Sequence, residues 1–130
     1  YEPQTHIVDL AKEQARSTGS AVTITHSPAD AVKGADIIYA DVWVSMGQEE
    51  ESAKHINDFK EYQINEELVQ LASPEFIFMH CLPAHRGEEV TAGVIDGKHS
   101  IVFNQAENRL HTQKAILITL FGENPNLEHN

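Results

Sequence analysis

The chain has 130 residues, of which 41% are hydrophobic and 22% are charged, and this ordinary globular composition disfavours both disorder and a fibrous architecture. Nine basic and 20 acidic side chains give a net charge of −11, which repels phosphate backbones and disfavours a nucleic-acid partner. The longest apolar runs, residues 37–40 and 115–118, are far shorter than the roughly 20 residues that cross a bilayer, and the single cysteine excludes an intrachain disulfide and favours the cytoplasm.

The first part of the chain predicts two helices with a strand between them. In residues 5–17 the apolar positions recur at helical spacing, and Gly19 follows as a stop signal. Residues 21–25 carry alternating β-branched side chains and predict a short strand. A serine, a proline and an aspartate in residues 27–30 match the cap and first turn of a short helix that ends near Gly34.

The rest of the chain predicts three buried strands that alternate with helices. Residues 37–42, 76–79 and 101–103 are apolar runs without a polar face. Residues 66–72 predict a short helix, and residues 105–121 predict the last and longest one. Strands without polar faces indicate a parallel sheet covered on both sides, so the predicted fold class is α/β.

Ligands of open parallel sheets bind beyond the carboxyl ends of the strands. Three segments leave the predicted strands at that edge: DVWVSMG from Asp41, HCLPAHRG from His80 and NQAENR from Asn104. We therefore expect any active site to be assembled from these three segments.

Asp41 supplies a carboxylate at the end of the first predicted strand. Ser45, Met46 and the flexible Gly47 follow it in a loop. A carboxylate there suits an ammonium ligand, and a loop that contains glycine can close over it. On spacing alone, Asp41 and Ser45 could equally hydrogen-bond the local backbone in a turn.

Cys81 follows the second predicted strand and has His80 and His85 as neighbours. A cysteine among histidines can be a nucleophile, a hydrogen-bonding thiol or a zinc ligand. Structural zinc sites usually take four Cys or His ligands, and the single cysteine leaves three to be found among scattered histidines, so we expect no metal. The alternative interpretation is that Cys81 is a small buried hydrophobic residue.

Arg109 is expected at the opening of the last predicted helix. Positive charge is unfavourable beside the amino-terminal helix dipole unless an anion lies close by. An anionic ligand would account for this placement, and so would pairing with a local acid such as Glu107.

Taken together, DVWVSMG, HCLPAHRGEEV and FNQAENRLHTQKAIL resemble the motifs of ornithine carbamoyltransferases in order and separation, over nearly the whole chain. HCLP with SMG upstream is specific within the wider family, since the aspartate, putrescine and acetylornithine enzymes are expected to differ in the SMG loop. The resemblance implies a Rossmann-like subunit whose amino-terminal domain binds carbamoyl phosphate and whose carboxyl-terminal domain binds L-ornithine. It implies transfer of the carbamoyl group to the side-chain amine, which yields citrulline and phosphate without a cofactor.

The same resemblance implies roles for individual residues. Asp41 would bind the α-ammonium of ornithine, with Ser45 and Met46 contributing from the closing loop. Arg109 would stabilise the tetrahedral oxyanion, and Cys81 would orient the attacking amine without forming a covalent bond. The residues implied for carbamoyl phosphate are Cys81, Leu82 and Arg109.

Two features of the resembled family do not occur in the sequence: a Ser-x-Arg-Thr-Arg phosphate motif, and a first strand of the ornithine domain with an Asn for the substrate carboxylate. We therefore expect residues 1–130 to be a carboxyl-terminal, ornithine-binding fragment, incomplete at the amino-terminal side of its sheet and inactive alone. The resemblance implies a homotrimer or a multiple of trimers for the full-length enzyme. The alternatives are a carbamoyltransferase for a related amine such as putrescine, or a noncatalytic amine-binding domain.

Overall fold

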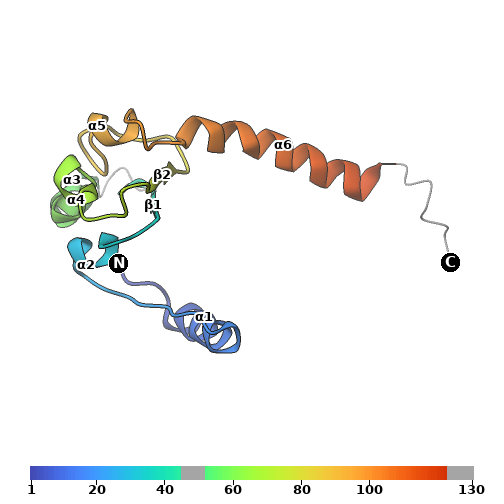
Figure 1. Ribbon diagram of the computed structural model, residues 1–130, viewed down its shortest axis with the longest axis horizontal. Coiled ribbons are helices and arrows are strands. Elements are labelled where there is room, and N and C mark those ends of the chain that lie inside the picture. Colours follow the sequence, from blue (N-terminus) through green and yellow to red (C-terminus); the bar gives the residue numbers. More distant parts are fainter. Residues whose placement is uncertain (45–51, 123–130) are drawn as a thin grey trace.

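The computed structural model describes residues 1–44 and 52–122, and its strands lie between a cluster of short helices and two longer, projecting ones (Figure 1). In chain order the elements are α1 (Thr5–Thr18), α2 (Pro28–Val32), β1 (Ile37–Ala40), α3 (Ser52–Phe59), the 3-10 helix η2 (Lys60–Tyr62), α4 (Glu66–Val69), β2 (Ile77–His80), α5 (Ala92–Ile95) and α6 (Val102–Phe121). None of the described helices is both long and apolar enough to cross a membrane.

The predicted helix boundaries are confirmed where a cap residue marks them. Gly19 ends α1 in the left-handed conformation at φ +72°, and its N–H donates to the carbonyl of Ala15. The Ser27 hydroxyl begins α2 by accepting from the backbone N–H of Asp30 at 3.2 Å. The first turn of α2 therefore lies next to a side chain that satisfies one of its free N–H groups.

The sheet consists of two parallel strands, β1 and β2, in the register Ile37 to Ile77 through Ala40 to His80. Both strands were predicted within two residues of their observed ends. This parallel pair confirms the α/β fold class. It also places the residues that follow the two strands at the same edge.

The predicted third strand at residues 101–103 is wrong. A short extended segment does pair with β2, because Phe78 N–H donates to the His99 carbonyl at 2.8 Å and Ile101 N–H donates to the Phe78 carbonyl at 3.0 Å. The chain then turns into α6 at Val102. A run of three apolar residues fits the buried start of a helix as well as it fits a strand, so the run alone could not decide between them.

Residues 21–25 form no strand either. Within the described part of the chain they pair with no other segment, and Val22 and Ile24 remain 36% and 47% exposed. Alternating β-branched residues favour an extended chain, but a strand also needs a neighbouring backbone for its N–H and C=O groups.

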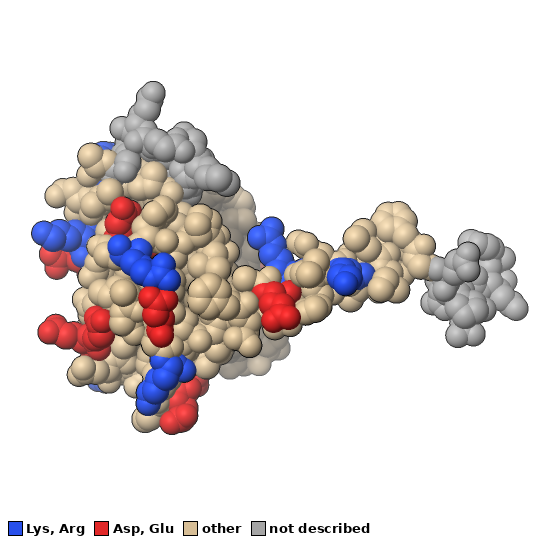
Figure 2. Space-filling model, turned by 90° about the horizontal axis from the view of Figure 1, so that it is seen from above, with Lys and Arg blue, Asp and Glu red and all other residues tan. Residues whose placement is uncertain are grey.

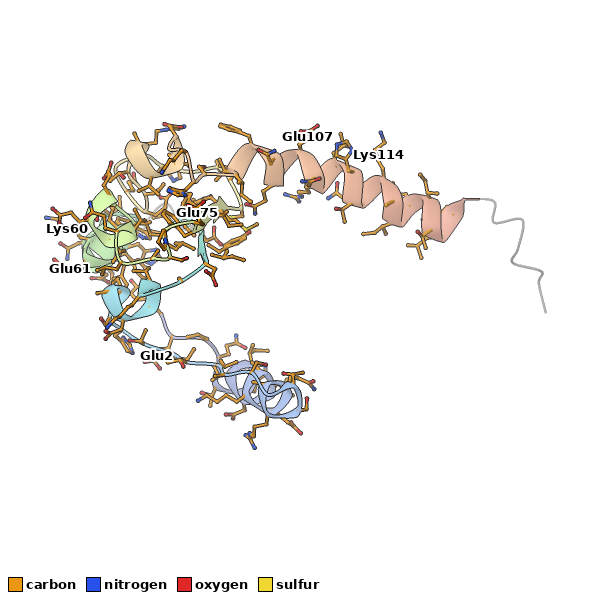
Figure 3. All side chains as sticks on the ribbon, in the orientation of Figure 1. Glu2, Lys60, Glu61, Glu75, Glu107 and Lys114 are labelled. Atoms are coloured by element: carbon orange, nitrogen blue, oxygen red, sulfur yellow. The ribbon has the colours of Figure 1, made fainter. Side chains whose placement is uncertain are left out.

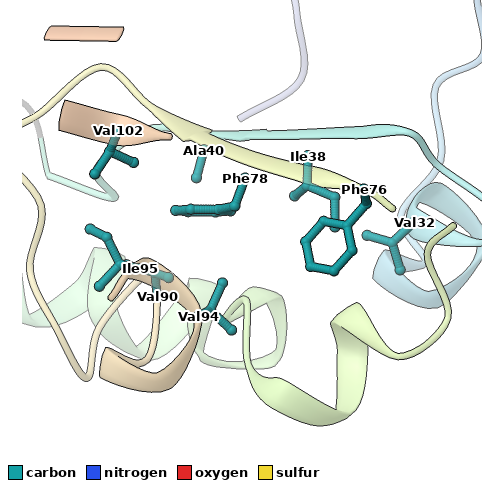
Figure 4. Close-up of a cluster of buried hydrophobic side chains, with 9 residues drawn as sticks. All are labelled: Val32, Ile38, Ala40, Phe76, Phe78, Val90, Val94, Ile95 and Val102. Carbon is teal, nitrogen blue, oxygen red and sulfur yellow. The ribbon is translucent and has the colours of Figure 1, made fainter. Parts of the chain in front are cut away.

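The core lies on one face of the sheet, which corrects the prediction of a sheet covered on both sides. Phe78 is fully buried, and Ile38 of β1 is 6% exposed on the same face, whereas Ile37 and Tyr39 on the opposite face are 58% and 55% exposed. The buried cluster comprises Val32, Ile38, Ala40, Phe76, Phe78, Val90, Val94, Ile95 and Val102 (Figure 4).

The two longest helices, α1 and α6, project from this core (Figure 1). Val102 is the buried residue of α6, and Leu117 and Phe121 farther along it are 56% and 80% exposed. On the face shown in Figure 2, charged side chains of both signs are scattered over the body of the molecule, and few lie on the projecting helix. Two of those few, Glu107 and Lys114, lie along one side of α6 (Figure 3).

Candidate active site

The strand ends bring two of the three predicted segments into contact. Because Ala40 pairs with His80 across the sheet, the next residues, Asp41 and Cys81, emerge side by side. The Cys81 thiol donates a hydrogen bond to Asp41 Oδ1 at 2.9 Å. The prediction that these two segments meet at one edge of the sheet is therefore confirmed for this pair.

Hydrogen bonds and partial desolvation shift the pKa values of Asp41 and Cys81 in opposite directions. Asp41 Oδ1 accepts from the thiol of Cys81 and from the backbone N–H of Val42 at 2.7 Å, and both bonds lower the pKa of the carboxyl group. The pKa of Cys81 is raised, first by partial desolvation of the sulfur and then by its hydrogen bond to the negatively charged Asp41. At neutral pH the site therefore holds a carboxylate beside a protonated thiol. Cys81 is exposed to solvent, so it is not the buried hydrophobic residue of the alternative interpretation.

This pairing predicts how Cys81 responds to an alkylating reagent. In the full-length protein, the pH at which Cys81 reacts half-maximally with iodoacetamide should lie above that of a free cysteine, since only the thiolate reacts. Asp41→Asn should lower that midpoint and speed alkylation at pH 8, because the substitution removes the negative charge beside the sulfur. Mass spectrometry of the peptide that contains Cys81 measures the rate. An unchanged midpoint in the variant would contradict the pairing.

The loop after β2 is held by the His80 side chain, which is 1% exposed. The backbone N–H of Leu82 donates to His80 Nδ1 at 2.8 Å, so the hydrogen-bond pattern assigns the ring proton to Nε2. Nε2 lies 3.3 Å from Oε1 of Glu89. The hydrogen bond from Leu82 N–H to His80 Nδ1 accompanies an unusual backbone at Leu82, which has a φ of +55° and precedes a cis peptide bond to Pro83. His80 thereby fixes the conformation of the loop that carries Cys81.

Glu89 is the buried acid behind this loop, and the sequence analysis did not identify it. It is 2% exposed, and its Oε1 accepts the backbone N–H of His85 at 2.6 Å. With His85 and Glu88 it places three metal-ligating atoms within 4.8 Å of one another. Of the Glu89 carboxylate oxygens, Oε1 binds the His85 N–H, whereas the buried Oε2 has no hydrogen-bond partner among the described residues.

Two further sets of side-chain contacts hold the loop after β2 at the protein surface. Arg86 donates to Asp96 through Nε at 2.8 Å and through Nη2 at 2.7 Å, in a two-pronged ion pair at the surface. The carboxamide of Gln63 donates to the carbonyls of Gly87 and Glu88 at 2.9 and 2.8 Å. The segment that follows Cys81 is therefore fixed along its length.

Arg109 lies inside α6 and not at its opening. The helix begins at Val102, three residues before the predicted start, and the dipole effect is confined to the first turn, so the argument from an unfavourable dipole fails. The Glu107 carboxylate lies 3.4 Å from His111 Nε2. Within the described residues, no hydrogen bond or ion pair joins Arg109 to Asp41 or Cys81.

Arg109 lines a groove of about 470 Å³ between α6 and the end of β2. Its polar lining residues come from successive turns of α6, and Met79 and Ile101 contribute the apolar side. These polar residues are Asn104, Gln105, Asn108, Arg109, Thr112 and Gln113. Ser45 and Met46, predicted to close over the site, lie outside the described residues.

Comparison with known proteins gives a consistent result. Residues 1–120 match a family model described as the aspartate/ornithine carbamoyltransferase, Asp/Orn binding domain. The chain is similar to the ornithine carbamoyltransferase of Geobacillus stearothermophilus, with 59% identity over 92% of this chain and 39% of that protein.

Solved structures of two ornithine carbamoyltransferases are also similar to this chain. The Pyrococcus furiosus enzyme superposes with a TM-score of 0.84 and 52% identity over 91% of this chain and 38% of that one. The anabolic enzyme of Campylobacter jejuni superposes with a TM-score of 0.86 and 36% identity over 92% of this chain and 40% of that one. The chain spans about two fifths of the length of the relatives that it matches.

Proposed function

We propose, because this chain belongs to the aspartate/ornithine carbamoyltransferase family, that it is the ornithine-binding part of an ornithine carbamoyltransferase. The whole protein would transfer the carbamoyl group of carbamoyl phosphate to the side-chain amine of L-ornithine and release L-citrulline and phosphate. The observation that carries this proposal is the hydrogen-bonded pair of Asp41 and Cys81 at the carboxyl ends of two parallel strands.

Asp41 is proposed to bind the α-ammonium of ornithine. Both of its hydrogen bonds, from Val42 and from Cys81, end on Oδ1. Within the described residues Oδ2 accepts no hydrogen bond, so it is available to a cationic ligand. The lowered pKa of Asp41 keeps the carboxylate charged at neutral pH, as an ammonium partner requires.

Cys81 is proposed to orient the reacting amine. Its hydrogen is donated to Asp41, so the sulfur presents lone pairs to a donor on its other side. A thiol with a raised pKa is a poor nucleophile, and direct attack by ornithine on the carbamoyl carbon needs no covalent intermediate with the protein. The backbone N–H of Leu82 donates to His80. The carbonyl oxygen of Leu82 is therefore the backbone group that can accept a hydrogen bond from the carbamoyl amide.

The reaction needs a neutral side-chain amine, attack on the carbamoyl carbon, and departure of phosphate from a tetrahedral intermediate. Negative charge collects on the carbamoyl oxygen before phosphate leaves. Arg109 is proposed to stabilise that charge, since a fixed cationic donor aimed at a developing oxyanion lowers the barrier by a few kcal/mol.

We infer that the rest of the subunit holds most of the carbamoyl phosphate. This inference is supported by the net charge of −11 and by the extent of the relatives, which are more than twice as long as the matched region. In the full-length protein, further strands would extend the sheet into a Rossmann-like one. The full-length protein would form a trimer or a multiple of trimers. The cytoplasm remains the predicted compartment, because a single cysteine fits a reducing environment.

The proposal predicts unequal effects of Asp41→Asn on the two substrates. In the full-length protein the KM for ornithine should rise by roughly 10- to 100-fold, because a lost charge-assisted hydrogen bond costs roughly 1.5 to 3 kcal/mol. Binding of carbamoyl phosphate should change less than about twofold, because an anion makes no favourable contact with that carboxylate. Steady-state kinetics with each substrate varied in turn measures both effects. Equal weakening for both substrates would count against the assignment.

Replacing the thiol tests whether Cys81 orients the amine or attacks the substrate. Cys81→Ser should keep the fold and lower kcat by about 5-fold, since a hydroxyl can make part of the same hydrogen bond and such bonds contribute about 1 kcal/mol. Rapid quenching during turnover, followed by mass spectrometry of the Cys81 peptide, should find no added carbamoyl group. A carbamoylated Cys81 that forms and decays at the rate of turnover would overturn the orienting role.

A further inference from the structure

The side chain of Gln105 connects both strands of the sheet to α6. Its Oε1 accepts the backbone N–H of His80 at 3.1 Å, and its Nε2 donates to Tyr39 Oη at 3.1 Å. Tyr39 precedes Asp41 by two residues, and His80 directly precedes Cys81. One carboxamide therefore binds the backbone of the residue before Cys81 and the phenol of the residue two positions before Asp41.

The side chain of Gln105 replaces a backbone hydrogen bond that the sheet lacks. The segment beside β2 is hydrogen-bonded through His99 and Ile101, and in a continued parallel ladder the next donor, His80 N–H, would bind the Ile101 carbonyl. That carbonyl accepts the backbone N–H of Gln105 at 2.9 Å, because α6 has begun. The side chain of the same residue accepts from His80 instead. The bond thus satisfies a strand N–H where the third segment leaves the sheet.

Among the described residues, few other contacts orient α6. Val102 is its buried residue, while Phe103 and Leu110 are 68% and 56% exposed. Arg109 follows Gln105 by one helical turn and therefore lies on the same face of the helix, and both residues line the groove beside Met79. A rotation of α6 about its axis or a shift along it would move Arg109 and stretch the Gln105 bonds together.

We propose that Gln105 is a positioning residue that sets the place of Arg109 relative to Asp41 and Cys81. The proposal rests on the proposed function, since it concerns the reaction that Arg109 promotes. Transition-state stabilisation depends on donor placement, and a misplacement of about 1 Å can cost about 100-fold in rate. Removal of the two Gln105 hydrogen bonds is therefore expected to lower kcat.

The test uses the full-length protein, carbamoyl phosphate and L-ornithine, with citrulline as the product measured. Gln105→Met keeps length and helix propensity but loses both hydrogen bonds, and it should lower kcat about 100-fold with less than about a threefold change in either KM. Tyr39→Phe loses one bond and should lower kcat by about 3- to 10-fold. Gln14→Met, the same change at an exposed position of α1, is the control and should match the unmodified protein.

Combination with Arg109→Met separates positioning from a general structural role. In that background Gln105→Met should change the residual kcat less than about twofold, because the group that it positions is gone. Unchanged kcat in folded Gln105→Met, or losses that multiply in the double variant, would overturn the proposal. If Gln105→Met does not fold, Tyr39→Phe takes its place in both measurements. An unchanged kcat in Tyr39→Phe, or a loss that multiplies with that of Arg109→Met, would then overturn the proposal. A full-length protein that forms no citrulline would overturn the proposed function itself, and this inference with it.

Discussion

Arg109→Met in the full-length protein is expected to lower kcat by about 100- to 1000-fold, the loss observed when a single oxyanion donor is removed. The KM for ornithine should change little, because the amino acid offers Arg109 no anion at its reacting end. Arg109→Lys should recover only part of the rate, since a single ammonium cannot reproduce the planar, forked guanidinium. The position of Arg109 in the groove between α6 and β2 is the structural basis for this expectation.

Steady-state kinetics of citrulline formation measures the effect, and Arg16→Met serves as its control. Arg16 lies in the last turn of α1, so its loss removes a positive charge without touching the groove. A loss confined to the KM values, with kcat intact, would show that Arg109 binds substrate without stabilising the transition state.

The 130-residue chain alone is expected to form no detectable citrulline. Carbamoyl phosphate is an anion, and the chain carries a net charge of −11, against which Arg109 is the one cation assigned to the reaction. The side chains of α1 and α6 are largely exposed, including Leu10 at 56% and Phe121 at 80%. These exposed apolar faces also favour aggregation of the isolated chain.

This expectation is tested by assaying the purified chain with both substrates beside the full-length protein at equal concentration. Light scattering records whether the isolated chain aggregates, and the assay is read on the soluble fraction. Robust turnover by the 130-residue chain, without any added polypeptide, would show that the proposed division of the site is misplaced.

The parts of the fold that local chemistry determines were predictable from the sequence. Ser27 caps α2 because its hydroxyl reaches a free N–H three residues away, and Gly19 ends α1 because it adopts a positive φ readily. The strands β1 and β2 were predictable because each is a short apolar run, although only one face of the sheet is buried. Asp41 and Cys81 were placed together by the rule that parallel strands end at one edge.

The parts that depend on distant contacts were not predictable. Gln105 contacts His80 and Tyr39, residues 25 and 66 positions away in the chain, and nothing in the spacing of the motif marks those partners. Glu89 was missed because acids are usually exposed, and its burial follows from its position behind His80. Arg109 was placed at the wrong point of its helix because the apolar run before it was assigned to a strand.

The central claim is tested most directly by the amine that the full-length protein carbamoylates. L-ornithine and putrescine share the reacting amine, but only ornithine has the α-ammonium that Asp41 is proposed to bind. With carbamoyl phosphate held constant, kcat/KM should be roughly 10- to 100-fold higher for ornithine, as expected from one charge-assisted hydrogen bond. Asp41→Asn should reduce that preference. Equal or higher kcat/KM with putrescine would contradict the assignment of substrate, and binding of ornithine without any product would indicate a noncatalytic amine-binding domain.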